Sequence, residues 1–151
     1  MNKMLKLPHD GLMLVSDGRK ALFLKNEGDD LYPNLKVERV LHAPDNPRTN
    51  EMGTDKPGRA FTMEGQRSAV EQTDWHKAAE RRFADDVAEA LNELCAAKPV
   101  KAIVVAAPPR TLAELREKFT DKVQRLILAE INKDLTKQPV YEIEQYLTDH
   151  A

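Results

Sequence analysis

The sequence predicts a single α/β domain built on a mixed β-sheet, with antiparallel strands at its N-terminal side and flanking helices. Two apolar runs, Leu12–Ser16 and Ala21–Lys25, flank an Asp-Gly pair, which is typical of a β-hairpin. The run Ala102–Ala107 is apolar throughout and ends at Pro108, as expected for a strand covered on both faces. Between these strands, residues 74–97 carry apolar side chains three or four positions apart, which predicts a long amphipathic helix.

Length and composition agree with one soluble domain covering residues 1–151. The chain is 41% apolar and 32% charged, and its net charge of −2 lacks the basic excess expected for binding naked nucleic acid. A single cysteine, Cys95, excludes an internal disulfide and a multi-cysteine metal site. No apolar segment approaches the roughly 18 residues of a membrane span, and the first residues lack the apolar core of a signal peptide. We therefore expect a cytoplasmic protein that does not use a membrane as its partner.

The N-terminal hairpin is expected to continue into a third strand. Asp17-Gly18 supplies the first turn, since glycine accepts a positive φ at no steric cost. Residues 26–30 form the next turn, and Leu35–His42 is the third strand. Its apolar and polar residues alternate imperfectly, which favours a position at the edge of the sheet or half covered.

Residues 43–73 are predicted to form a long loop. Three of the six glycines lie there, and few apolar side chains recur at a regular spacing. Loops of this length are uncommon inside a compact domain and are usually functional or disordered. Positive and negative residues are equal in number over 43–82, so the loop does not have the basic excess of a phosphate-binding groove.

The long helix presents one apolar stripe, made of Trp75, Ala79, Phe83, Val87, Leu91 and Leu94. Cys95 lies beside this stripe and is interpreted as a buried structural thiol. Lys98-Pro99 ends the helix, because the residue before a proline avoids the helical region.

After the apolar strand the chain is expected to return as a helix that begins at Thr111. Thr111 and Glu114 have the spacing of a capping box. Residues 123–135 are ambiguous: their periodicity favours a helix, whereas Leu126–Ile131 also fits a strand that follows a short helix. A final amphipathic helix is predicted over Val140–Leu147.

No catalytic constellation stands out. The four histidines, His9, His42, His76 and His150, are not at metal-ligand spacing and are interpreted as surface residues. The chain contains neither a Gly-x-Ser-x-Gly elbow nor a glycine-rich phosphate loop. We therefore expect no metal and no cofactor, and a protein that is not an enzyme.

Two polar clusters remain as candidate binding surfaces: the Arg48–Arg67 loop and the corner Asn132–Thr136. Both are dense in hydrogen-bonding groups, which local turns could also consume. The candidate binding residues are Arg48, Asn50, Asp55, Arg59, Gly65, Gln66, Arg67, Lys133 and Asp134.

Four segments, in this order, resemble the bacterial host attachment protein family: Ser16–Asp29, Gly53–Arg59, Ala106–Leu112 and Asn132–Thr136. The resemblance spans about Leu12–Leu147. This family is similar in fold to the middle domain of archaeal and eukaryotic class-1 peptide release factors, which has a ribonuclease-H-like topology. The resemblance therefore favours the strand interpretation of Leu126–Ile131, which we adopt.

The resemblance implies a role in attachment of bacteria to host cells. Our first hypothesis is a non-enzymatic, cytoplasmic binding or regulatory protein with an unknown protein partner. Its recognition surface would combine the Arg48–Arg67 loop with the Lys133-Asp134 corner. The metal-binding carboxylates of ribonuclease-H-like enzymes have no counterpart in this sequence.

The alternative hypothesis is a translation-associated factor that binds the ribosome or releases peptidyl-tRNA. The release factors carry Gly-Gly-Gln in the loop before their long helix, and this chain has Glu64-Gly65-Gln66 there. Gln66 would position a water molecule. Glu64 departs from the pattern, because a charged side chain stands where backbone freedom is wanted.

Overall fold

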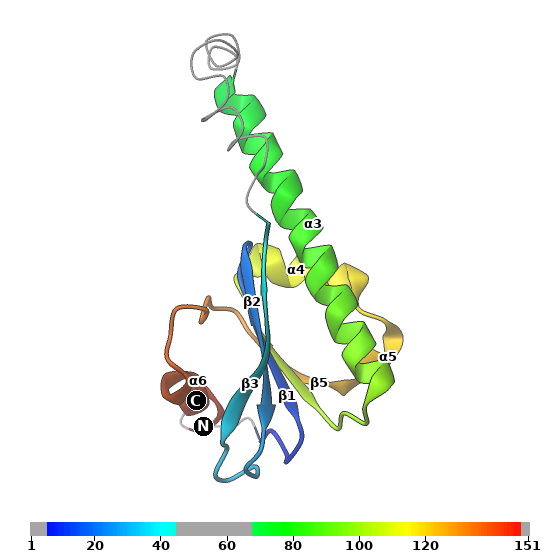
Figure 1. Cartoon of the computed structure of the whole chain (residues 1–151), viewed down its shortest axis with the longest axis vertical. Coiled ribbons are helices and arrows are strands. Elements are labelled where there is room, and N and C mark those ends of the chain that lie inside the picture. The colour runs from blue at the N-terminus through cyan, green and yellow to red at the C-terminus, as the bar shows by residue number, and fades with distance from the viewer. Residues whose placement is uncertain (1–5, 45–67, 149–151) are drawn as a thin grey trace.

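The computed structural model describes residues 6–44 and 68–148 (Figure 1). The described elements are β1 (Leu12–Ser16), β2 (Lys20–Asn26), β3 (Leu35–His42), α3 (Ser68–Ala97), β4 (Ile103–Ala106), α4 (Pro109–Lys118), α5 (Asp121–Leu126), β5 (Ile127–Ile131) and α6 (Val140–Thr148). One five-stranded sheet has the order β3-β2-β1-β4-β5. β1, β2 and β3 pair antiparallel, whereas β4 pairs parallel with β1 and β5 parallel with β4. The predicted mixed α/β sheet is thus confirmed, and its strand order is compatible with a ribonuclease-H-like topology.

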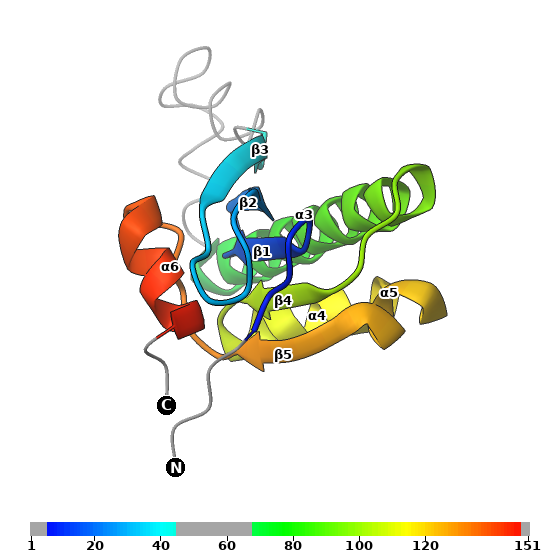
Figure 2. The same ribbon diagram turned by 90° about the horizontal axis from the view of Figure 1, so that it is seen from below.

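The two faces of the sheet are covered by different helices (Figure 2). On one face, α3, α4 and α5 pack against strand residues that include Leu14, Phe23 and Val105. On the other face, α6 packs against residues that include Met13 and Val104. Because β1 and β4 are covered on both sides, every residue of both strands is buried, as the sequence predicted for the run that contains β4. Among the described residues, no helix is long and apolar enough to span a membrane.

The first hairpin is confirmed, but the reason given for its glycine is wrong. No described glycine has a positive φ, so Gly18 is not required for its backbone conformation. Asp17 makes the turn instead: its Oδ1 accepts hydrogen bonds from the backbone N–H groups of Arg19 and Lys20, both at 2.7 Å. A Cβ at position 18 would lie 2.9 Å from Cγ of Glu80 on α3, so a larger residue here would have to displace that flexible side chain.

Two helix starts differ from prediction. α3 begins at Ser68 rather than Asp74, which shortens the loop predicted over 43–73; residues 68–73 contain no glycine or proline to stop the helix. The capping box is also wrong, because α4 begins at Pro109 and no side chain caps it. Proline is favoured at the first helical position, where its fixed φ suits the helix and its missing N–H is no loss.

The ambiguous region resolves into both alternatives in succession. Thr120 caps α5 by accepting a hydrogen bond from the N–H of Val123, and the helix ends at Leu126. β5 then pairs with β4, so the adopted strand interpretation is confirmed. The predicted final helix is confirmed as α6.

Candidate functional site

Three parallel strands bring distant segments to one edge of the sheet. β1, β4 and β5 run in the same direction, so the residues that follow them lie at a common carboxyl edge, where open α/β sheets commonly bind ligands. The N–H of Ala107, just after β4, donates to the carbonyl oxygen of Ile131 at the end of β5 over 3.0 Å. Three of the four segments that resemble the host attachment family therefore have residues at this edge.

Thr136 joins the turn after β1 to the corner after β5. Its hydroxyl lies 2.6 Å from Oδ1 of Asp134 and 3.0 Å from Oδ2 of Asp17. The backbone N–H of Thr136 also donates to Oδ1 of Asp134 over 2.9 Å. The residue is 4% exposed, and its single hydroxyl proton lies within reach of both carboxylates. This contact ties together segments that are 119 residues apart in the chain.

Replacing Thr136 with valine is expected to lower the free energy of unfolding by about 1–3 kcal/mol, because the buried site would lose the hydroxyl that donates to Oδ2 of Asp17 while keeping its shape. Urea unfolding followed by circular dichroism measures this change. Thr136→Ser is the matched control, since it keeps the hydroxyl and should recover most of the loss. A valine variant as stable as the unmodified protein would contradict the tie.

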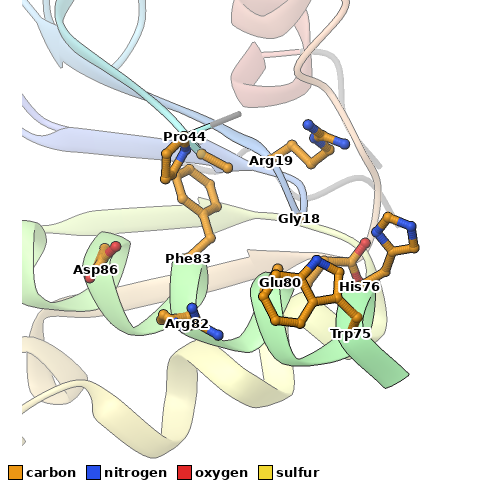
Figure 3. Close-up of a pocket in the computed structure, with 11 residues that line it drawn as sticks. Gly18, Arg19, Pro44, Trp75, His76, Glu80, Arg82, Phe83 and Asp86 are labelled. Atoms are coloured by element: carbon orange, nitrogen blue, oxygen red, sulfur yellow. The ribbon is translucent and has the colours of Figure 1, made fainter. Parts of the chain in front are cut away.

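A pocket of about 360 Å³ lies beside this edge (Figure 3). It is bounded by α3, by the turn between β1 and β2, and by the residues that follow β3. The lining residues are Gly18, Arg19, Ala43, Pro44, Trp75, His76, Ala79, Glu80, Arg82, Phe83 and Asp86. Figure 3 shows Phe83 extending from α3 towards Pro44, with Trp75 and His76 further along the same helix.

The pocket combines an apolar interior with a charged rim. Phe83 is 3% exposed and belongs to the core, whereas Trp75, at the start of the predicted apolar stripe, is only half-buried and lines the cavity. Arg19 and Arg82 carry positive charge at the lining, and Glu80 and Asp86 carry negative charge. The pocket therefore suits a ligand whose apolar group enters the interior and whose polar or charged groups stay at the rim. It suits a free anion or a free cation less well.

Glu114 does not have the capping role that the sequence predicts. Glu114, which was expected to cap α4, is buried and lies 3.5 Å from Nε of Arg110 and 4.0 Å from Nε of Arg81. Two arginines, one of them on α3, therefore compensate its charge where α3 and α4 pack together.

The predicted binding residues fall into two groups. Arg48, Asn50, Asp55, Arg59, Gly65, Gln66 and Arg67 lie outside the described residues, so the proposed loop and the role of Gln66 stay predictions. The other two have local partners: Asp134 holds Thr136, and Nζ of Lys133 lies 5.5 Å from the centroid of the Tyr146 ring. Asp134 is therefore explained by hydrogen bonds within its own turn, which was the other interpretation of the corner Asn132–Thr136.

Other reactive groups give no second site in the described part of the chain. Residues 6–44 and 68–148 contain no group of three His, Cys, Asp or Glu side chains arranged to hold a metal ion. Cys95 is buried as predicted, and that burial raises the pKa of its thiol, with a smaller opposite effect of Lys122. A thiol of this kind is a poor nucleophile.

The pocket was missed because its residues come from three distant segments and form no motif. One feature of the sequence pointed towards the pocket: Trp75, the only tryptophan of the chain, lies near the start of the apolar stripe of the long helix.

The chain matches a model of a known protein family. A family model described as "Protein required for attachment to host cells" matches residues 12–147, which includes every described strand. A search of curated proteins found no match. The likeness to release-factor middle domains stays a prediction.

Proposed function

The chain belongs to the family of proteins required for attachment to host cells, and from that membership we propose that it serves attachment as a binding protein. The pocket between α3 and the turn after β1 receives a side chain of a partner protein. The observation that carries this proposal is the pocket's position, beside the edge where three of the four family-like segments come together.

The chemistry of the lining favours a particular kind of partner. A volume of about 360 Å³ is near the lower end of the usual range for ligand pockets, so it fits one large side chain and its neighbours rather than a folded surface. Trp75 and Phe83 suit an aromatic or branched aliphatic anchor, since aromatic side chains contribute large contact areas. Charges of both signs at the rim suit flanking residues of mixed charge. The partner is therefore an extended peptide segment with an apolar anchor.

We place this activity in the cytoplasm, so that the effect on attachment is regulatory rather than a direct contact with the host cell. A single cysteine, buried and free, gives the fold no dependence on an oxidising compartment.

Filling the pocket is expected to abolish the function without unfolding the protein. In Ala79→Phe, the added ring would occupy space that the anchor needs, because Ala79 lines the cavity and is only partly buried. We expect attachment of bacteria that carry this variant as their only copy to fall to the level of a strain lacking the gene. Attachment is measured as adherent bacteria per host cell.

The matched control is Ala96→Phe, which adds the same ring at an exposed position near the other end of α3. Both variants should have unchanged urea midpoints and cellular amounts. Normal attachment with Ala79→Phe would reject the pocket as the binding site. Protease treatment of intact bacteria tests the location: a cytoplasmic protein stays uncut, and cleavage would indicate exposure on the cell surface.

A further inference from the structure

The outer edge of β3 is open in the described part of the chain. β3 is the last strand of the sheet on its side, and eight residues long, and none of the described strands pairs with its outer edge (Figure 2). Such an edge offers unpaired backbone N–H and C=O groups to another strand, except at Leu35, whose N–H donates to Oε2 of Glu144 on α6 over 2.7 Å. The opposite edge differs, because β5 has five residues and its Glu130 is held by Arg116 of α4 at 3.0 Å.

A β-bulge changes which side chains of β3 share a face. Leu24 pairs with Val37 and Phe23 pairs with Arg39, so Glu38 is the extra residue. Val37 and Val40 pair with Leu24 and Leu22, which face α6, so both valines lie on that face. Arg39 pairs with Phe23 on the α3 face, and Glu38 lies 3.9 Å from Lys98 at the end of α3. Glu38 and Arg39 therefore share one face, and Val37 and Val40 share the other.

This arrangement is self-complementary in one antiparallel register. If two copies of β3 pair about a two-fold axis between Glu38 and Arg39, each Glu38 lies opposite Arg39 of the second copy. In the same register each Val37 lies opposite Val40 of the second copy, and the bulge places both members of each pair on one face. We propose that this chain forms a homodimer through β3 in this register, which joins two sheets into one.

Neighbouring registers are unfavourable. A shift of one residue in one direction sets Glu38 opposite Glu38, and a shift in the other direction sets Arg39 opposite Arg39. Like charges directly across two strands destabilise the pairing. The charges and the bulge therefore disfavour pairing of β3 in other registers, but they permit pairing with a second copy in the proposed register.

The exposed side chains of the strand support a second copy as the occupant. Val37 is 45% and Val40 is 41% exposed, although Leu22 and Leu24 beside them are buried. Pairing in the proposed register would place each valine opposite one valine of the second copy, in two symmetric pairs. Apolar cross-strand pairs of this kind stabilise a sheet.

Charge reversal tests both the dimer and its register. The association is measured by analytical ultracentrifugation of the full chain over a range of concentrations. Glu38→Arg sets arginine opposite arginine, and Arg39→Glu sets glutamate opposite glutamate, so each is expected to weaken the dimer about tenfold or more. The double variant Glu38→Arg/Arg39→Glu restores opposite charges across the axis and should dimerise within about threefold of the unmodified protein.

Glu117→Arg reverses an exposed charge on α4 and should leave association unchanged, which controls for net charge. Urea midpoints of all variants establish that they are folded. A monomeric unmodified protein at every concentration would overturn the proposal. So would single variants that dimerise normally, or a double variant that remains as weak as the single ones.

Discussion

Asn26→Asp is expected to lower the free energy of unfolding by about 3 kcal/mol or more at neutral pH. Asn26 is fully buried at the end of β2, where its side-chain amide serves several backbone groups. Its Nδ2 donates to the carbonyl oxygens of Leu7 and Asp29, and its Oδ1 accepts from the N–H groups of Gly28 and Asn34, over distances of 2.8–3.1 Å. The residue thus holds the N-terminal segment and the turn between β2 and β3 together.

Aspartate has the same shape but cannot donate when ionised. Its second oxygen would face carbonyl oxygens, and burial would add a desolvation cost, so we expect the pKa of the introduced carboxyl group to be raised in the folded state. Because the folded state then binds the proton more tightly, the loss should be smallest below about pH 4 and should grow as the pH rises through the folded-state pKa. Urea unfolding at several pH values measures this dependence.

Asn34→Asp is the matched control for Asn26→Asp, because the Asn34 side chain is exposed. It makes the same chemical change nearby and should shift stability by no more than about 0.5 kcal/mol. Equal effects of the two substitutions, or a loss from Asn26→Asp that does not depend on pH, would contradict the hydrogen-bonding role of the buried amide.

Phe83→Ala is expected to destabilise the protein by about 3–5 kcal/mol. Phe83 lies in the core between α3 and the sheet, and the same ring forms part of the pocket wall. Removing it would leave a void that connects the core to the pocket. Phe83→Leu keeps most of the apolar volume and should lose much less stability, which chemical unfolding can measure.

This double role restricts how the pocket can be tested. A loss of attachment with Phe83→Ala would have two explanations, instability or a changed pocket. Ala79 avoids this difficulty, since it lines the pocket without being fully buried. A loss below about 1 kcal/mol for Phe83→Ala would show that the ring is not part of the core.

Local signals were sufficient for most of the fold. The continuous apolar run that contains β4 predicts a strand because that strand is covered on both faces, and the structure has helices there. β5 could not be assigned from periodicity, because Ile127 and Ile131 are four residues apart and satisfy a helix as well as a strand. Its pairing with β4, which is non-local, decides the outcome.

The candidate site was less predictable than the fold. Asp17 was assigned to the turn, which is correct for Oδ1, but its Oδ2 contacts Thr136 far along the chain. Gly18 was assigned a backbone role, although its φ is not positive and the feature that marks the position is the close approach of the Glu80 side chain from α3. Both errors have one cause: these contacts arise only when the sheet and α3 are assembled, and no short sequence pattern encodes them.

The length of α3 has a consequence for the pocket. The helix has 30 residues, about 45 Å, and runs past the end of the sheet (Figure 1), but within residues 75–97 its fully buried side chains begin only at Phe83. Among the side chains that the structure describes, Trp75 and Ala79 therefore belong to a part of the helix without fully buried residues, so we expect local unfolding there to need less free energy than global unfolding. A partner that binds the pocket would also order this turn of the helix. The affinity of the partner would then depend on helix formation, so we expect the affinity to fall on warming as the helix frays.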